Sequence, residues 1–372
     1  MSDENVKLKK IIEHIKQRGL DGVIIYSSGT CNVLRASYLY YFSDFKPLGP
    51  RNAAVISTSG DVTLLVQPQW DALRATEKSW IGDIRGTSDF AKDLTGILRE
   101  QNIAGSVGII GAREMNYDVY GTIQGQAAIE LTDDIIEEMA KEKTPREIEI
   151  IKKVAKIADI GFQAFFDHAR VGIREYELNA EMEFAMRSAG AHDIFVLMSS
   201  GKNNYEMHEP TDRRLSEGDI VIAEFSPNYE GQFIQLCRTV VLGEPSPVLY
   251  EKYDMLMHAF HEALKVIKPG VPASEISKAM NKVIGDAGYA KYCYPPYMRA
   301  RGHGFGVGSV APGAGLNDDT KLNIEKDQVI VPHPNQWLPE TGYLACGDSV
   351  LVTDTGYEIL TEIEMKLFVK EV

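Results

Sequence analysis

The stretch GIREYELNAEMEFAMRSAGA (residues 172–191) occurs a second time, in diverged form, as GVPASEISKAMNKVIGDAGYA (residues 270–290). The pairs that match at one constant offset are Gly172 with Gly270, Glu177 with Glu275, Ala189 with Ala287, and Gly190 with Gly288. A long segment of helical period precedes each copy (146–169 and 247–267), and strand-like segments follow. This pattern indicates a duplicated unit. We therefore expect a C-terminal domain, 145–372, in which helices cover a curved sheet and a pocket lies near a pseudo-twofold axis.

The residues before the repeat predict a smaller N-terminal α/β domain, 1–135. GVIIY (22–26) reads as a buried strand, AAVIS (53–57) and VTLLV (62–66) flank a turn, and 89–102 has a helical period. No glycine-rich nucleotide motif occurs in this region. The charge-rich segment 131–150 is interpreted as a surface crossing between the two domains. The predicted fold class is therefore mixed α/β with two domains.

Composition excludes several classes of protein. The chain has 372 residues, 44% of them hydrophobic and 25% charged, which is ordinary for a soluble globular protein. A net charge of −14 is unsuited to binding nucleic acid. The four cysteines, including Cys31, are scattered, as in proteins of a reducing compartment, and no apolar run is long enough to span a membrane. We expect a cytoplasmic protein with a small-molecule substrate.

The hairpin GDIVIAEFSPNYEGQFIQLCRTVVLG (218–243) contains residues that could carry chemistry. Side chains alternate between the two faces of a strand, so Phe233, Gln235 and Cys237 are expected on one face. Cys237 on that face has two interpretations. It is either a nucleophile or a small apolar residue that fills space, and the second fate is the commoner one.

Separated motifs in a fixed order resemble one known family. They are SSGKNNYEMHEPTDRRLSEGD (199–219), CRT (237–239), RGHGFGVG (301–308), VPHP (331–334) and GDSVLVTDTGYEIL (347–360). Together they resemble the creatinase/aminopeptidase P/prolidase family. The resemblance covers most of the chain and implies a pita-bread C-terminal domain built from the duplicated unit. It also implies a homodimer in which the N-terminal domain offers Arg51 to the partner's pocket. The alternative interpretation of Arg51 is a plain surface arginine.

The resemblance also implies where metal ligands would lie. Metal-dependent members of the family carry Asp, Asp, His, Glu and Glu in this order. The matching positions here are Glu224, Gln235, His303, His333 and Gly347. Two divalent ions need bridging carboxylates, which a neutral Gln and a Gly cannot supply. The sequence therefore predicts a site without a metal cofactor. One alternative keeps a single divalent ion at Glu224, His303 and His333, a ligand set that suits a transition ion.

The resemblance to the metal-free creatinase-like members suggests His208 as the general acid/base, because its His-x-Pro context precedes a Gly-Asp strand. His303, His333 and Cys237 complete the catalytic candidates. Glu224, Gln235, Phe233 and Arg51 are the substrate-binding candidates. Creatine itself is a poor match, because Cys237 and His333 stand where creatinase has glutamates.

The leading hypothesis is a metal-independent, creatinase-like hydrolase of a C–N bond in a small nitrogenous compound such as an amide, amidine or lactam. The first alternative is a single-metal or metal-dependent Xaa-Pro peptidase-like hydrolase. The second is a non-catalytic pita-bread binding module.

Overall fold

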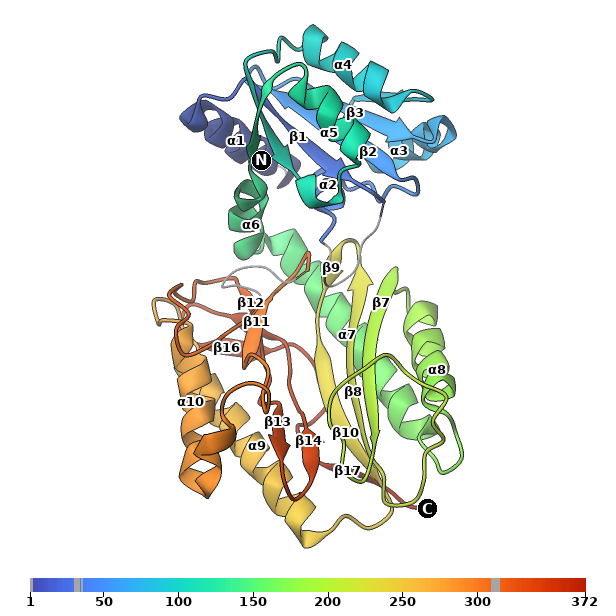
Figure 1. Ribbon diagram of the computed structural model, residues 1–372, viewed down its shortest axis with the longest axis vertical. Helices are drawn as coiled ribbons and strands as arrows, with labels where there is room; N and C mark the ends of the chain where they lie inside the picture. The colour runs from blue at the N-terminus through green and yellow to red at the C-terminus, as the bar shows by residue number, and fades with distance from the viewer. Residues whose placement is uncertain (1–2, 30–33, 35, 309–314) are drawn as a thin grey trace. The chain divides into compact units, whose positions relative to one another are not determined.

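The computed structural model describes residues 3–29, 34, 36–308 and 315–372, and it forms two compact units, Met1–Ala140 and Lys141–Val372 (Figure 1). Cys31 lies outside the described residues. Within the described ranges, no helix combines the length and the apolar character that a membrane span requires. The mixed α/β architecture predicted from the sequence is confirmed.

The N-terminal unit is a mixed sheet with helices packed against it. Its strands follow the order β4-β3-β2-β1-β5-β6, with β1–β2 and β2–β3 antiparallel and the other pairs parallel. The apolar faces of α4 and α5 pack on the central strands in one buried core cluster. The elements are α1 (Asp3–Arg18), β1 (Gly22–Ser27), α2 (Tyr38–Ser43), β2 (Arg51–Ser57), β3 (Val62–Gln67), α3 (Ala72–Lys78), β4 (Asp83–Gly86), α4 (Phe90–Glu100), β5 (Ser106–Ile110), α5 (Tyr117–Gln124), β6 (Ala128–Leu131) and α6 (Asp133–Lys141).

The C-terminal unit contains two larger sheets. One has the strand order β17-β10-β8-β7 with β9 paired to β8, and the other has the order β11-β12-β15-β16 (Figure 1). The elements are α7 (Pro145–His168), α8 (Glu175–Ser188), β7 (Asp193–Gly201), β8 (Ile220–Tyr229), β9 (Gln232–Phe233), β10 (Leu236–Leu242), α9 (Pro247–Val266), α10 (Ser274–Ile284), β11 (Gly302–Phe305), β12 (Val329–Pro332), β13 (Gln336–Leu338), β14 (Gly342–Leu344), β15 (Val350–Val352), β16 (Tyr357–Ile359) and β17 (Phe368–Lys370).

The duplicated sequences occupy equivalent places in this unit. Helix α8 follows α7 and packs on it, as α10 follows and packs on α9. Gly172 and Gly270 both have positive φ, at 88° and 85°, and each donates its backbone N–H to the segment that leads into a strand of its own half. A left-handed backbone of this kind favours glycine. The repeat read from the sequence therefore reflects a structural duplication.

The segment 131–150 does contain the boundary between the two compact units, at Ala140 and Lys141, but it is largely helical and partly buried and not a plain surface crossing. Helix α6 and the first turns of α7 occupy most of the segment. Ile135, Ile136 and Met139 are buried on one side of α6, while its acidic residues keep the other side polar. Helix α7 begins with Thr144 and Glu147 in a capping box, which fixes its start despite Pro145. The high charge of this segment hid the amphipathic pattern of α6 in the sequence.

The hairpin of β8 and β10 separates two faces of its sheet. Phe225 lies on the face covered by α7, because a Cβ added at Gly161 of α7 would lie 3.2 Å from the Phe225 ring. Glu224 points to the opposite face, since side chains alternate along a strand. Ile222 and Cys237 share that opposite face and belong to the core cluster that contains α9 and α10. We call the side covered by α7 the helix face and the other the inner face.

Candidate functional site

The five positions matched to metal ligands gather on the inner face. Glu224 of β8 is the register partner of Cys237 in β10, and Cys237 in turn bridges to Gly347. A Cβ added at Gly347 would lie 2.6 Å from the Cβ of His333. The rings of His333 and His303 follow, with centroids 5.3 Å apart. This gathering of residues from both halves of the duplication is the candidate site.

Glu224 is the acidic group of this site. Burial raises the pKa of its carboxyl to about 7, opposed by the positive charge of Arg299 and by a hydrogen bond from the Gln235 side chain. Gln235 is itself buried, and its backbone N–H donates to the hydroxyl of Ser349 (2.9 Å). Burial therefore favours the protonated form of this carboxyl far more than it does for an exposed glutamate.

His303 presents one nitrogen to the site. Its Nδ1–H donates to the carbonyl of Gly304 at 3.2 Å, which assigns the proton to Nδ1 and leaves the Nε2 lone pair available. Burial lowers the pKa of the imidazole to about 4. His303 is therefore a neutral acceptor at pH 7.

His333 has the opposite tautomer, and Asn335 fixes it. The Asn335 Oδ1 accepts from the backbone N–H of Arg299 (2.9 Å) and its Nδ2 donates to the carbonyl of Ala300 (3.1 Å), so the amide orientation is determined twice. The same Nδ2 lies 2.6 Å from His333 Nδ1, which must therefore accept. The proton of His333 is on Nε2. Burial lowers the pKa of this imidazole to about 3, and the neighbouring His303 adds to the shift.

Cys237 lies between Glu224 and Gly347 but is not activated. Burial, and next the nearby Glu224 carboxyl, raise the pKa of its thiol well above the ordinary value. A thiol with a raised pKa is a poor nucleophile near pH 7. Its contacts favour the interpretation of Cys237 as a space-filling residue.

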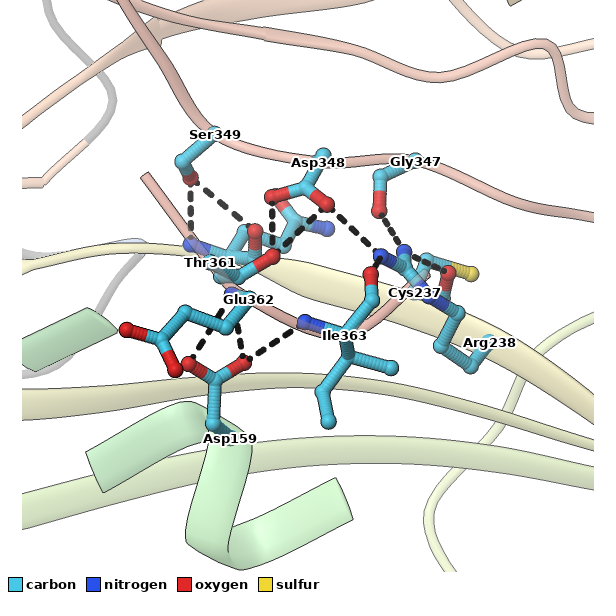
Figure 2. Close-up of polar contacts among 10 residues, drawn as sticks. Asp159, Cys237, Arg238, Gly347, Asp348, Ser349, Thr361, Glu362 and Ile363 are labelled. Atoms are coloured by element: carbon cyan, nitrogen blue, oxygen red, sulfur yellow. Dashed lines mark hydrogen bonds and ion pairs between the residues drawn. The ribbon is translucent and has the colours of Figure 1, made fainter. Parts of the chain in front are cut away.

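On the helix face, a polar network supports the strands that carry the site (Figure 2). Arg238 and Asp348 form an ion pair at 2.7 Å, with side chains 0% and 2% exposed. The guanidinium also donates to the carbonyls of Cys237 (3.0 Å), Gly347 (2.8 Å) and Ile363 (2.7 Å). In the described part of the chain its Nε has no partner. Thr361 completes the contacts by donating to Asp348.

His208 is not brought to the Glu224 cluster. It pairs with Met198, and Met198 faces Ala223, so the register places His208 on the helix face. Its Nδ1 lies 2.8 Å from the carbonyl of Glu209 and 3.9 Å from a carboxylate oxygen of Glu175, the first residue of α8. Among the described residues, no hydrogen bond, ion pair or ring contact joins it to Glu224, His303 or His333. The preceding residue, Met207, packs on the inner-face core instead.

The two remaining candidates lie in different surroundings. Phe233 is buried, and its ring meets that of Phe305 edge-on at 6.4 Å, beside the strand that carries His303. Arg51 forms an ion pair with Asp118 (2.9 Å) inside the N-terminal unit. A role for Arg51 in a partner's pocket stays a prediction.

Two residues of the site were missed in the sequence. Arg299 is exposed, but its charge acts on Glu224, His333 and Tyr343. Asn335 is buried and connects Arg299 to His333. The available signal was the position of both residues beside matched motifs, RGHGFGVG for Arg299 and VPHP for Asn335.

The fold and the gathered positions define the class of protein. The family model "Metallopeptidase family M24" matches residues 149–354, and the model "Creatinase/Prolidase N-terminal domain" matches residues 7–171. The first match covers more than half of the chain. The protein belongs to metallopeptidase family M24, and the resemblance to the creatinase/aminopeptidase P/prolidase family with a pita-bread fold is confirmed.

Individual relatives match over nearly the whole chain. A Xaa-Pro dipeptidase of Pyrococcus furiosus is 27% identical over 97% of this chain and 99% of its own. The prolidase structure from Pyrococcus horikoshii has a TM-score of 0.85 at 26% identity, covering 97% of this chain and 99% of that one. A prolidase structure from Thermococcus sibiricus has a TM-score of 0.87 at 23% identity, covering both chains fully (100% and 100%), and shows the fold alone.

These findings correct the leading hypothesis drawn from the sequence. A metal-independent, creatinase-like hydrolase without a cofactor is contradicted, because the family is a metallopeptidase family and its named relatives are Xaa-Pro dipeptidases. The error was to infer cofactor independence from two substituted ligand positions, Gln235 and Gly347. The alternative of a metal-dependent Xaa-Pro peptidase-like hydrolase is the better supported interpretation.

The residues of the site nevertheless do not fit the family's metal centre. Gln235 carries no charge, and the space beside Gly347 is occupied by His333. His333 offers no free lone pair, because its Nδ1 accepts from Asn335 and its Nε2 carries the proton. Across the described ranges, no three His, Cys, Asp or Glu side chains form a group that could hold a metal ion. We therefore derive no chemical step through a metal.

Proposed function

We propose that this protein is a Xaa-Pro dipeptidase-like hydrolase that cleaves the C–N bond of a small peptide. The observation that carries the proposal is the gathering of all five ligand-matched positions at one place on the inner face, in a chain that belongs to a metallopeptidase family. The relatives named Xaa-Pro dipeptidase match along nearly its full length. The substrate and its bond type are taken from those relatives.

The neutral forms of the buried groups suit an uncharged bond. His303 accepts through Nε2, His333 donates through Nε2–H, and the protonated form of Glu224 also donates. A peptide group offers both a carbonyl acceptor and an N–H donor, so it can be matched by this mixture. Such contacts hold and orient the peptide group, and orientation contributes to catalysis.

A second candidate is a binding module without catalytic activity. The specific observation in its favour is that Gln235 and Gly347 have no metal-binding carboxylate. In addition, His333 occupies the space beside Gly347. A family fold can serve a different function when its site is changed. This candidate predicts binding of small peptides without turnover.

The experiment that separates the two is a turnover assay with alanylproline, run on protein stripped by chelation and on protein with added Mn²⁺ or Co²⁺. Dipeptidase activity above a mock purification supports the proposal, and its absence under every condition together with retained binding favours the module. Elemental analysis accompanies it. We expect at most one ion per chain, and two tightly bound ions would contradict the placement of Gln235 and Gly347 at ligand positions.

His208→Ala provides an internal comparison in the same assay. If His208 is the acid/base predicted from the sequence, its removal lowers kcat by about 10²–10⁴-fold. Its position on the helix face instead predicts a change below about threefold. Activity close to that of the unmodified chain would remove His208 from the mechanism.

A further inference from the structure

We propose that Arg301 is a positioning residue for the candidate site. Its guanidinium holds the connection 333–335, between β12 and β13, so that Asn335 keeps the proton of His333 on Nε2. The inference rests on the proposed function only for its effect on turnover, because the hydrogen bonds that carry it are independent of the bond that is cleaved. No role was assigned to Arg301 in the sequence, although it opens the RGHGFGVG motif.

The side chain of Arg301 is fully buried and joins separate segments of the C-terminal unit. It is 0% exposed. Its Nη1 donates to the carbonyl of Asn335 (2.6 Å), and its Nη2 donates to the side-chain oxygen of Gln336 (2.8 Å). On the other side, its Nε donates to the side-chain oxygen of Asn281 on α10 (2.8 Å). The guanidinium therefore ties α10 to the connection that follows His333.

The backbone of Arg301 holds the same connection from its other end. The backbone N–H of His333 donates to the carbonyl of Arg301 (3.1 Å), and the backbone N–H of Asn335 donates to the carbonyl of His333 (2.8 Å). His303 lies two residues after Arg301, on β11, the strand that pairs with β12. A displacement of Arg301 would therefore disturb the segments that carry both histidines of the site.

The charge of Arg301 is not matched by a carboxylate contact. Among the described residues, the hydrogen-bond partners of its guanidinium are neutral oxygens, and Asp318 is reached only through the side chain of Asn281 (3.0 Å). Burying a charge without an opposite charge costs free energy, which an apolar side chain in this place would avoid. A guanidinium instead offers five donors in one rigid plane, so it can hold acceptors on several segments at once. Positioning accounts for an arginine here, where stability alone does not.

The held connection determines which group His333 offers to a ligand. Asn335 donates to Nδ1 of His333 (2.6 Å) only while its own amide stays in place. If the connection shifts, this contact is lost and the imidazole takes either tautomer. With the connection held, the site presents an acceptor on His303 and a donor on His333, the combination that a peptide group requires. Arg301 therefore acts on a bound peptide through Asn335 and His333, without touching it.

Long-range ¹⁵N–¹H spectra of the full chain at pH 7.5 test the positioning role directly. The His333 signals are identified by their loss in His333→Gln. The unmodified chain should show the Nε2–H tautomer alone, whereas Arg301→Met should show both tautomers. Arg301→Lys keeps the charge but not the planar donors, and it should lie between the two. The matched control is Arg213→Met, which removes a guanidinium that binds Ser200 and Asp219 instead and should leave the tautomer unchanged.

Two changes at Asn335 test whether Arg301 acts through this residue. Asn335→Asp should place a proton on Nδ1 of His333, because a carboxylate can only accept. Asn335→Ala should show both tautomers. Adding Arg301→Met to Asn335→Ala should not change their ratio further, because two residues that act in series are not additive. A further change of the ratio in the double variant would mean that Arg301 acts by another route.

Turnover of alanylproline measures the consequence for the proposed function. Arg301→Met should lower kcat at least about tenfold while KM changes less than about threefold, because orientation is lost and not uniform binding. Thermal unfolding of each variant shows whether it is folded. A milder variant, Asn281→Ala, leaves Arg301 in place but frees its Nε from α10, and it should shift the tautomer ratio in the same direction as Arg301→Met.

The Nδ1–H tautomer in the unmodified chain would overturn the proposal. So would an unchanged tautomer ratio in Asn281→Ala and in every Arg301 variant that folds. A fall in kcat for Arg301→Met without any change of tautomer would also contradict the route through Asn335. If the unmodified chain has no turnover, the hydrolase function is refuted, and the tautomer ratios alone then decide the positioning role.

Discussion

The two faces of the β8–β10 hairpin both carry buried polar groups, and these groups differ in their interactions with the rest of the protein. On the helix face, Arg238 and Asp348 direct nearly all their polar atoms to protein partners (Figure 2). On the inner face, Glu224 lies next to Ala223, the register partner of Arg238, and burial raises its pKa to about 7, while His333, which follows β12, carries its proton on Nε2. Buried polar groups that are hydrogen-bonded to the protein make a rigid support, and the Arg238 Nε is the exception within this described ion pair. The comparison shows how one hairpin can carry a supporting network on one face and a candidate site on the other.

The largest expected effect comes from breaking the support. Arg238→Met leaves Asp348 buried with Thr361 as its remaining side-chain hydrogen-bond partner among the described residues, so the free energy of unfolding should fall by about 3–5 kcal/mol. Urea denaturation measures it. The double variant Arg238→Met/Asp348→Leu should recover part of the loss, because no charge is then left without its partner. A loss below about 1 kcal/mol in the single variant would show that the helix face is not the rigid one.

The next effect concerns pH and the inner face. The folded pKa of Glu224, about 7, exceeds its reference value of 4.5, so this group stabilises the fold fully at low pH and loses that contribution as the pH rises through 7. The buried histidines act oppositely, since their lowered pKa values remove stability as the pH falls below about 6.5. Comparison with Glu224→Gln cancels the histidine contributions.

The free energy of unfolding of Glu224→Gln, measured relative to that of the unmodified chain, should therefore rise by about 3 kcal/mol between pH 4 and pH 8 in buffers without divalent ions. Unfolding free energies of both proteins across this range measure the difference. A constant difference would mean that Glu224 has an ordinary pKa and that the inner face is better solvated than its burial indicates.

The smallest effect concerns the closed space at Gly347. Gly347→Ala brings a Cβ within 2.6 Å of the His333 Cβ, so His333 must move, and stability should fall by about 1–3 kcal/mol. Gly356→Ala is the matched control, because nothing lies within 4 Å of its added Cβ. Thermal unfolding of both variants provides the measurement. Equal effects would show that the space beside Gly347 is open.

The sequence predicted what depends on order and period. The duplication around Gly172 and Gly270 and the hairpin follow from spacing, which the backbone geometry enforces. The division of roles among the histidines could not be predicted this way. His208 was assigned by its neighbours in the chain, but strand pairing with Met198 decides which face it occupies.

The contribution of Asn335 was also hidden from the sequence. Its importance comes from two hydrogen bonds that fix its amide and a third that fixes a tautomer, and none of these depends on a recognisable motif. Cofactor dependence was misjudged for a related reason. The residues Gln235 and Gly347 show only which ligand side chains are absent. The family match, which the sequence motifs alone did not settle, shows that the chain belongs to a metallopeptidase family.

The contact between Gly347 and His333 has an evolutionary consequence. A side chain at position 347 meets the histidine at 333, because the new Cβ would lie 2.6 Å from the His333 Cβ. A mutational route to the family's ligand pattern that changes residue 333 first avoids this contact. A change at 347 alone carries the stability cost expected for Gly347→Ala, because His333 must move. Histidine at 333 therefore makes a later substitution at 347 more costly than it would be with a smaller residue there.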